Sequence, residues 1–120
     1  MINVSKSAET LQDGITNMMA GAKDDYKQNS YYGKSELSDY CKEKLANFES
    51  QTTVREGKKY IKVIYDRSVF AFIVKEDFKH FKKGDVLKPA GWAAPALNQP
   101  RGNVLKGNYP IQWTGPLYLN

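Results

Sequence analysis

Residues 60–74 read YIKVIYDRSVFAFIV, and this stretch decides the fold of the chain. Its first part, residues 60–65, is rich in β-branched and aromatic side chains, which favour a strand. Asp66-Arg67-Ser68 is typical of a tight turn, and the apolar run of residues 69–74 predicts a central strand covered on both faces. The stretch therefore predicts a β-hairpin in the middle of the chain.

Turn-forming and strand-forming residues continue toward the C-terminus. Residues 82–85 indicate a second turn, and residues 86–88 a third strand that ends at Pro89. The prolines and glycines of residues 89–103 predict a long ordered loop or arm. We expect short closing strands at residues 104–105, 111–113 and 117–119. The second half of the chain thus predicts a small antiparallel sheet or a partial barrel.

The first fifty residues show a helical period instead. Apolar residues three or four positions apart predict a helix over residues 4–26, capped by Ser5 or Ser7. The same spacing predicts a second helix over residues 35–50, capped by Ser35. We therefore predict an α+β fold, with two N-terminal helices packed on a small antiparallel sheet or partial barrel.

The first helix also offers a surface for self-association. Met18 and Met19 share its apolar stripe with the small residues 20–22, which would allow another helix to approach closely. A homo-oligomer formed through the N-terminal helices is therefore one expectation, although the sequence does not decide the oligomeric state.

Length and charge indicate one domain with two unlike parts. The chain has 120 residues, which suits a single domain spanning residues 1–120. Residues 1–50, the helical part, hold six Lys and eight Asp or Glu, a net charge of −2. Residues 51–120, the β-rich part, hold twelve Lys or Arg and five acids, a net charge of +7. Such a one-sided field attracts nucleic acids or acidic protein surfaces, unless the lysines serve only solubility.

Few residues suit catalysis or metal binding. Cys41 is the only cysteine and His80 the only histidine, so we expect neither an intrachain disulfide nor a zinc site. No glycine-rich phosphate loop is present. We therefore expect a protein that is not an enzyme and takes no cofactor or metal. Its longest apolar run, residues 69–74, is too short to span a bilayer, and we expect a cytoplasmic protein without a membrane partner.

Basic and aromatic residues of the second half make the strongest candidate for a binding surface. Phosphates and acidic proteins favour clustered cations, and aromatic rings among them can stack on bases. The candidate ligand- or partner-binding residues are Lys58, Lys59, Lys62, Arg67, Lys82, Lys83, Trp92, Arg101 and Asn103. Trp92 stands in a loop of Gly, Ala and Pro without a period, so it either plugs the core or presents a surface anchor.

Arg101-Gly102-Asn103 is an isolated basic group among neutral residues. The planar guanidinium suits phosphate or carboxylate, and Gly102 and Asn103 both tolerate the positive φ angles of an anion-binding nest. The alternative is a turn whose Arg101 lies over Trp92 or Trp113.

Short segments of the second half resemble a set of small uncharacterised proteins encoded by tailed bacteriophages. The segments are KYIKV at 59–63, SV at 68–69, FIV at 72–74, FKKGDVLK at 81–88, APA at 94–96, RGNV at 101–104 and WTG at 113–115. The resemblance covers about residues 58–116 and carries no established activity, so no functional residue is transferred. It implies a viral origin and action in the bacterial cytoplasm of the host.

Three functions remain open at this point. The first is a phage-encoded, non-catalytic protein that binds a host protein through its basic and aromatic surface, in host takeover or counter-defence. The second is nucleic-acid binding through the hairpin lysines and residues 75–88. The third is sequestration of a small anionic nucleotide by Arg101, Asn103 and Trp92.

Overall fold

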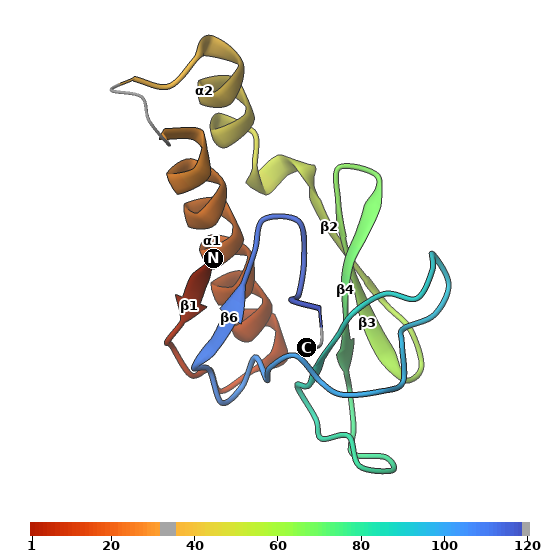
Figure 1. The fold of residues 1–120 in the computed structure, drawn as a ribbon. Helices are drawn as coiled ribbons and strands as arrows, with labels where there is room; N and C mark the ends of the chain where they lie inside the picture. Colours follow the sequence, from red (N-terminus) through yellow and green to blue (C-terminus); the bar gives the residue numbers. More distant parts are fainter. Residues whose placement is uncertain (32–35, 119–120) are drawn as a thin grey trace.

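The computed structural model describes residues 1–31 and 36–118 of the chain. Within these residues it contains helices α1 (Leu11–Tyr31) and α2 (Asp39–Ala46), a 3₁₀ turn (Glu49–Gln51) and six strands. The strands are β1 (Ile2–Val4), β2 (Thr52–Glu56), β3 (Tyr60–Tyr65), β4 (Ser68–Val74), β5 (Val86–Leu87) and β6 (Tyr109–Ile111). They form a four-stranded antiparallel sheet of order β2-β3-β4-β5 and a two-stranded β1-β6 sheet (Figure 1). The α+β class is therefore confirmed, whereas the described sheets are open and close no barrel.

The predicted hairpin is present at the centre of the larger sheet. β3 and β4 pair from Tyr60↔Val74 to Tyr65↔Ser68, and the turn residues Asp66 and Arg67 have φ of 47° and 71°. Two successive residues with positive φ give the turn whose twist matches that of a hairpin. β4 lies between β3 and β5 and is buried over residues 70–74, as expected for a strand covered on both faces.

The inner face of the larger sheet packs against α1. The apolar stripe of the helix and alternate residues of the strands share one core. Its members include Ile15, Met18 and Ala22 of α1, Ile61, Val63 and Tyr65 of β3, Phe70 and Ile73 of β4, and Tyr109 and Ile111 of β6. α1 therefore packs against both sheets (Figure 1).

The outer face carries a second, smaller apolar cluster. It comprises Phe72, Val74, Phe81 and Leu87, with Tyr60, Val69 and Phe78 packed against it. The ring of Tyr60 meets those of Phe72 and Phe78 edge-on, with centroids 5.8 Å and 6.0 Å apart. The loop after β4 therefore packs back onto the end of the sheet where β3 begins.

A buried carboxylate joins α1 to the C-terminal region. Asp25 is 1% exposed, and its Oδ2 accepts a hydrogen bond from the Trp113 backbone N–H at 2.9 Å. Its Oδ1 forms an ion pair with the amino group of Met1. One side chain of α1 thus holds both the segment that enters β1 and the segment that follows β6.

The first helix begins later than the sequence predicted. It starts at Leu11 rather than at residue 4, and Thr10 caps it in place of Ser5 or Ser7. Thr10 Oγ1 accepts a hydrogen bond from the backbone N–H of Asp13 at 3.1 Å. None of the helices in the described part of the chain is both long and apolar enough to cross a bilayer.

The second helix is shorter than predicted. It spans Asp39–Ala46, and its cap is Ser38, whose Oγ accepts a hydrogen bond from the Cys41 backbone N–H at 3.2 Å. The predicted cap, Ser35, lies outside the described residues. Met18 and Met19 are 0% and 7% exposed, because both side chains pack in the core of this fold.

The short strands differ most from the prediction. β1 and β2 were not predicted. The predicted helix began at Val4, the last residue of β1, and β2 is largely exposed and polar. Of the expected closing strands, only residues 111–113 overlap one, β6, whereas residues 104–105 form a turn. Residues 117–118 form no strand, and residue 119 lies outside the described part.

We predict that Gly14→Ala lowers the free energy of unfolding, although alanine favours a helix by about 1 kcal/mol over glycine. A Cβ at this position would lie 2.6 Å from the carbonyl oxygen of Val104 and 2.7 Å from its Cβ, so α1 would have to move away. Urea denaturation checks this. Gly91→Ala is the control, because a Cβ there meets nothing within 4 Å. A Gly14→Ala variant as stable as the wild type would contradict the close packing.

We predict that stability decreases above about pH 10, because buried tyrosines resist ionisation in the folded chain. Burial, with a smaller contribution from the Asp66 carboxylate, raises the pKa of Tyr65 to about 12, and burial also raises the pKa of Tyr109. The two tyrosines contribute fully to the free energy of unfolding below the pKa of tyrosine in the unfolded chain. This contribution is lost as the pH rises toward their pKa in the folded chain. Denaturation between neutral and alkaline pH should show a smaller alkaline loss in Tyr65→Phe and Tyr109→Phe. The exposed Tyr118→Phe variant should behave like the wild type.

Candidate partner-binding site

Four side chains form a row across the outer face of the larger sheet. Arg55 of β2 pairs with Lys62 of β3, Lys62 with Phe72 of β4, and Phe72 with Leu87 of β5. Directly paired residues of antiparallel strands point to the same face. Two cations therefore lie beside the outer apolar cluster, and Lys62 Nζ is 5.7 Å from the centre of the Phe72 ring.

Trp92 lies at the tip of a short arm, residues 88–96. A backbone hydrogen bond from the Ala96 N–H to the Lys88 carbonyl, at 2.8 Å, closes its base. The indole is 51% exposed, and Lys62 Nζ lies 4.6 Å from its ring centre. Of the two alternatives for Trp92, the structure therefore excludes the core plug and places the indole at the surface.

A shallow groove of about 250 Å³, called the basic groove below, runs beside this row. It is lined by Arg55, Glu56, Gly57, Lys58, Lys59, Tyr60, Lys62, Phe72 and Ala93. The carboxylate of its acidic residue, Glu56, is ion-paired with Lys75 at 2.7 Å. Lys58 and Lys59, from the β2–β3 turn, are exposed. The basic groove is therefore cationic, with aromatic side chains in its wall and an exposed indole beside it.

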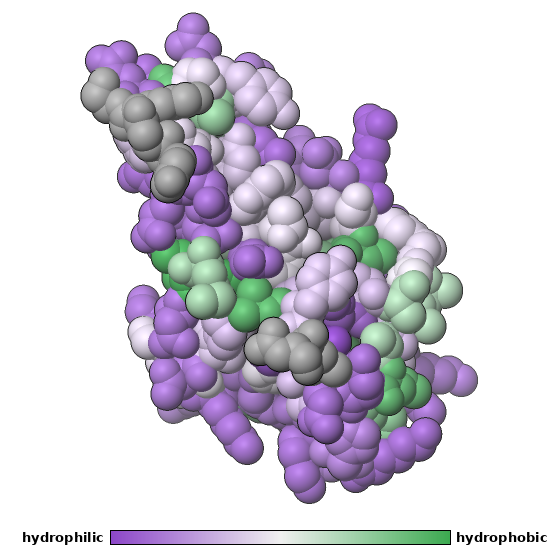
Figure 2. All heavy atoms as spheres, viewed as in Figure 1, coloured by the Kyte–Doolittle hydropathy of each residue, from purple (hydrophilic) through white to green (hydrophobic). Residues whose placement is uncertain are grey.

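Lys82 and Lys83 lie on the loop after β4, and the structure places this loop near Lys59. Phe78 of the loop lies under the Lys59 side chain, with Nζ 5.5 Å from the ring centre. Both loop lysines are exposed, and Lys82 Nζ lies 3.8 Å from the Asp77 carboxylate. Figure 2 shows hydrophilic residues gathered over this lower end of the molecule. The cationic surface therefore continues from the basic groove onto the loop.

Arg67 is not part of this surface. It lies on the β3–β4 turn, at the opposite end of the hairpin from Lys58 and Lys59 (Figure 1). β3, with six residues, separates the two ends by roughly 20 Å. Arg67 therefore lies on the hairpin, as expected, but apart from the basic groove.

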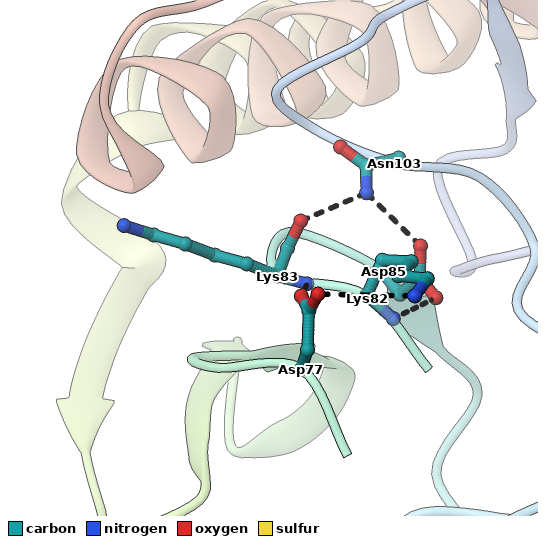
Figure 3. A network of polar contacts seen from close by, with 5 residues as sticks. All are labelled: Asp77, Lys82, Lys83, Asp85 and Asn103. Atoms are coloured by element: carbon teal, nitrogen blue, oxygen red, sulfur yellow. Dashed lines mark hydrogen bonds and ion pairs between the residues drawn. The ribbon is translucent and has the colours of Figure 1, made fainter. Parts of the chain in front are cut away.

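Asn103 is a structural residue in this fold (Figure 3). Its side-chain amide donates hydrogen bonds to the Lys83 carbonyl at 2.9 Å and to Asp85 Oδ1 at 3.0 Å. Its Oδ1 accepts from the backbone N–H groups of Leu105 and Lys106, at 2.9 and 3.1 Å. Asn103 is 7% exposed, and these internal bonds occupy its whole side chain.

Arg101 does not line the basic groove either. Its Nε and Nη1 atoms are enclosed and have no hydrogen-bond partner in the described chain, and burial lowers the pKa of its guanidinium. The described residues show no stacking of Arg101 on Trp92 or Trp113. Burial, and then the charge of Arg101, lowers the pKa of Lys88, so these two cations are neighbours.

His80 lies on the surface. Its Nε2 is 2.8 Å from the carbonyl oxygen of Asn98, and its ring packs against that of Phe81 at a tilt of 36°, with centroids 4.0 Å apart. Among residues 1–31 and 36–118, no group of three His, Cys, Asp or Glu side chains is arranged to hold a metal ion.

A second aromatic group surrounds Lys44 of α2. Its Nζ lies 4.9 Å from the Trp113 ring centre, 5.0 Å from that of Tyr26 and 5.9 Å from that of Tyr65. Rings arranged in this way bind cations. Because the Lys44 ammonium already lies among the three rings, this group joins α2 to the rest of the fold and leaves no room for an external cation.

Sequence reasoning missed Arg55 as a site residue. No strand was predicted at residues 52–56, so nothing indicated that Arg55 pairs with Lys62. A signal was nevertheless present: two threonines and a valine precede Arg55, and such residues favour strands.

We predict that Asn103→Ala lowers the free energy of unfolding by about 3 kcal/mol, because it leaves several buried polar groups without partners. Asn103→Asp retains the acceptor oxygen but places a second carboxyl beside that of Asp85. Repulsion raises the pKa of the introduced carboxyl in the folded state, so this variant should regain stability relative to wild type as the pH falls. Chemical denaturation at several pH values measures both effects. Wild-type stability in Asn103→Ala would contradict the structural role.

Comparisons with known proteins give a family and no function. No curated protein and no solved structure matches the chain. A family of unknown function, DUF7717, matches residues 1–119. The chain therefore belongs to the DUF7717 family.

Proposed function

We propose that this chain is a small, non-catalytic binding protein that engages an acidic surface of a host protein through the basic groove and Trp92. The main support for this proposal is the half-exposed indole of Trp92, which lies against Lys62 beside a groove lined by four basic side chains. The resemblance to phage proteins is the reason for proposing a viral origin, action in the host cytoplasm, and a role in takeover or counter-defence.

A protein partner suits the shape of this surface. Interface hot spots are enriched in Trp, Tyr and Arg, and cations around an apolar anchor give complementarity to an acidic partner. Trp92 is at the tip of a hydrogen-bonded arm, so little conformational entropy is lost when a partner fixes it. Lys62 lies over the indole, and the acidic side chain in the groove, Glu56, is already paired.

Single-stranded nucleic acid is the second candidate. An exposed indole beside several cations also suits stacking on one base with phosphates in the groove. The Tyr60 ring, in the wall of the groove, packs against Phe72 and Phe78 and is not free to stack on a base. One exposed ring supports stacking on successive bases less well than it supports a single anchor.

Capture of a small nucleotide by Arg101, Asn103 and Trp92 is the weakest candidate. Neither Arg101 nor Asn103 lines the groove beside Trp92, and the Asn103 side chain is bonded internally.

We predict that affinity capture from bacterial lysate retains an acidic protein, and that Trp92→Ala weakens binding of the purified partner by about 2 kcal/mol, roughly 30-fold. Lys58→Glu should also weaken it. Arg67→Glu is the matched control, because it makes the same charge change at the far end of the hairpin and should bind like the wild type.

Three results would contradict this proposal. One is that no partner is retained at low salt. Another is that the Trp92→Ala and Lys58→Glu variants bind the partner as tightly as the wild type. The third is salt-dependent binding of single-stranded DNA or RNA that Lys58→Glu abolishes, since that outcome favours the nucleic-acid alternative.

A further inference from the structure

The two edges of the larger sheet differ. Beyond β5, the backbone of residues 101–104 continues the hydrogen bonding: the Val86 N–H donates to the Gly102 carbonyl and the Arg101 N–H to the Val86 carbonyl, both at 2.8 Å. Beyond β2, no described strand pairs. β2 is thus an open edge of five residues without proline or glycine, and Val54 at its centre is 38% exposed.

The backbone groups that face this open edge follow from the pairing of β2 with β3. Hydrogen bonds run from the Gly57 N–H to the Tyr60 carbonyl and from the Asp66 N–H to the Gln51 carbonyl, at 2.9 and 3.0 Å. The register between them is unbroken. Because hydrogen bonding alternates along an antiparallel ladder, odd-numbered residues bond to β3. The N–H and C=O groups of Thr52, Val54 and Glu56 therefore point outward.

We propose that β2 pairs antiparallel with β2 of a second copy of this chain, around a two-fold axis at Val54. This register pairs all the outward groups, Val54 with Val54 and Thr52 with Glu56 of the second copy. It places Thr53 opposite Arg55, so no like charges are directly opposed. A shift of the axis to Arg55 would oppose two arginines, and a shift to Thr53 would leave Glu56 without a partner on the second β2.

The side chains at this edge are also suited to a second copy. On the inner side of β2, a groove of about 270 Å³ opens between α1 and the strand. Apolar side chains in its wall include Ile15, Met19, Phe48 and Val54. Val54 of the second copy would lie beside this groove. A symmetric contact of this kind uses the same patch on both chains.

Self-association over a concentration series is the primary measurement. We expect sedimentation equilibrium to show a monomer–dimer equilibrium. Val54→Pro should abolish the dimer and leave a folded monomer, because the lost N–H faces outward and proline is tolerated at a strand edge. Val54→Thr, the matched control, keeps the donor and should still dimerise. A monomer at every concentration, or a dimer unchanged by Val54→Pro, overturns the proposal.

Disulfide trapping tests the register even where Val54→Pro fails to fold. In a Cys41→Ser background, Val54→Cys should give a covalent dimer on mild oxidation, because paired Cα atoms about 5.5 Å apart are within disulfide reach. Thr53→Cys should give none, because its two copies lie diagonally. Cross-linking through position 53 and not 54 overturns the proposed axis. Either result is independent of whether the basic groove binds an acidic partner.

Discussion

The buried contact between Asp85 and Asn103 determines the path of the C-terminal third of the chain. Asp85 Oδ2 accepts a hydrogen bond from the Lys82 N–H at 2.8 Å, which closes the turn before β5, and Oδ1 accepts one from the Asn103 amide. Asn103 in turn bonds to the backbone on both sides of the contact. Every polar atom of both side chains thus has a partner, which is the condition under which buried polar groups stabilise a fold.

This contact fixes the base of the arm that carries Trp92. Residues 101–104 lie along β5 because Asn103 holds them there, so the chain leaves the sheet after β5 and must return to the same edge. The arm is the connection between these two fixed points. Its hydrogen-bonded base presents the indole over Lys62 instead of burying it. Asn103, which the sequence predicted as a binding residue, therefore has a structural role: it fixes the base of the arm that carries Trp92.

The fold gathers basic side chains at one end of the larger sheet, which the net charge of +5 does not reveal. β2 and β3 bring Arg55 beside Lys62, and the packing of Phe78 on Tyr60 brings the loop after β4 to the same end. Arg67, only five residues from Lys62, is carried to the opposite end by the strand between them. Proximity in sequence therefore does not predict proximity in a sheet, because each strand residue moves the chain by about 3.3 Å.

The sequence alone determined the central hairpin, because an apolar run of β-branched and aromatic residues around a tight turn has few other ways to be buried. It also determined the α+β class and the amphipathic face of α1, both of which follow from local spacing and polarity. Tertiary structure decided the short strands β1 and β2, the late start of α1, the internal role of Asn103 and the exposure of Trp92. Each of these depends on a contact between residues distant in the chain, such as Val4 with Tyr109 or Asp85 with Asn103. Local propensity carries no information about such contacts. Whether a polar or aromatic side chain is buried, hydrogen-bonded or exposed depends on the distant residues that the fold brings next to it.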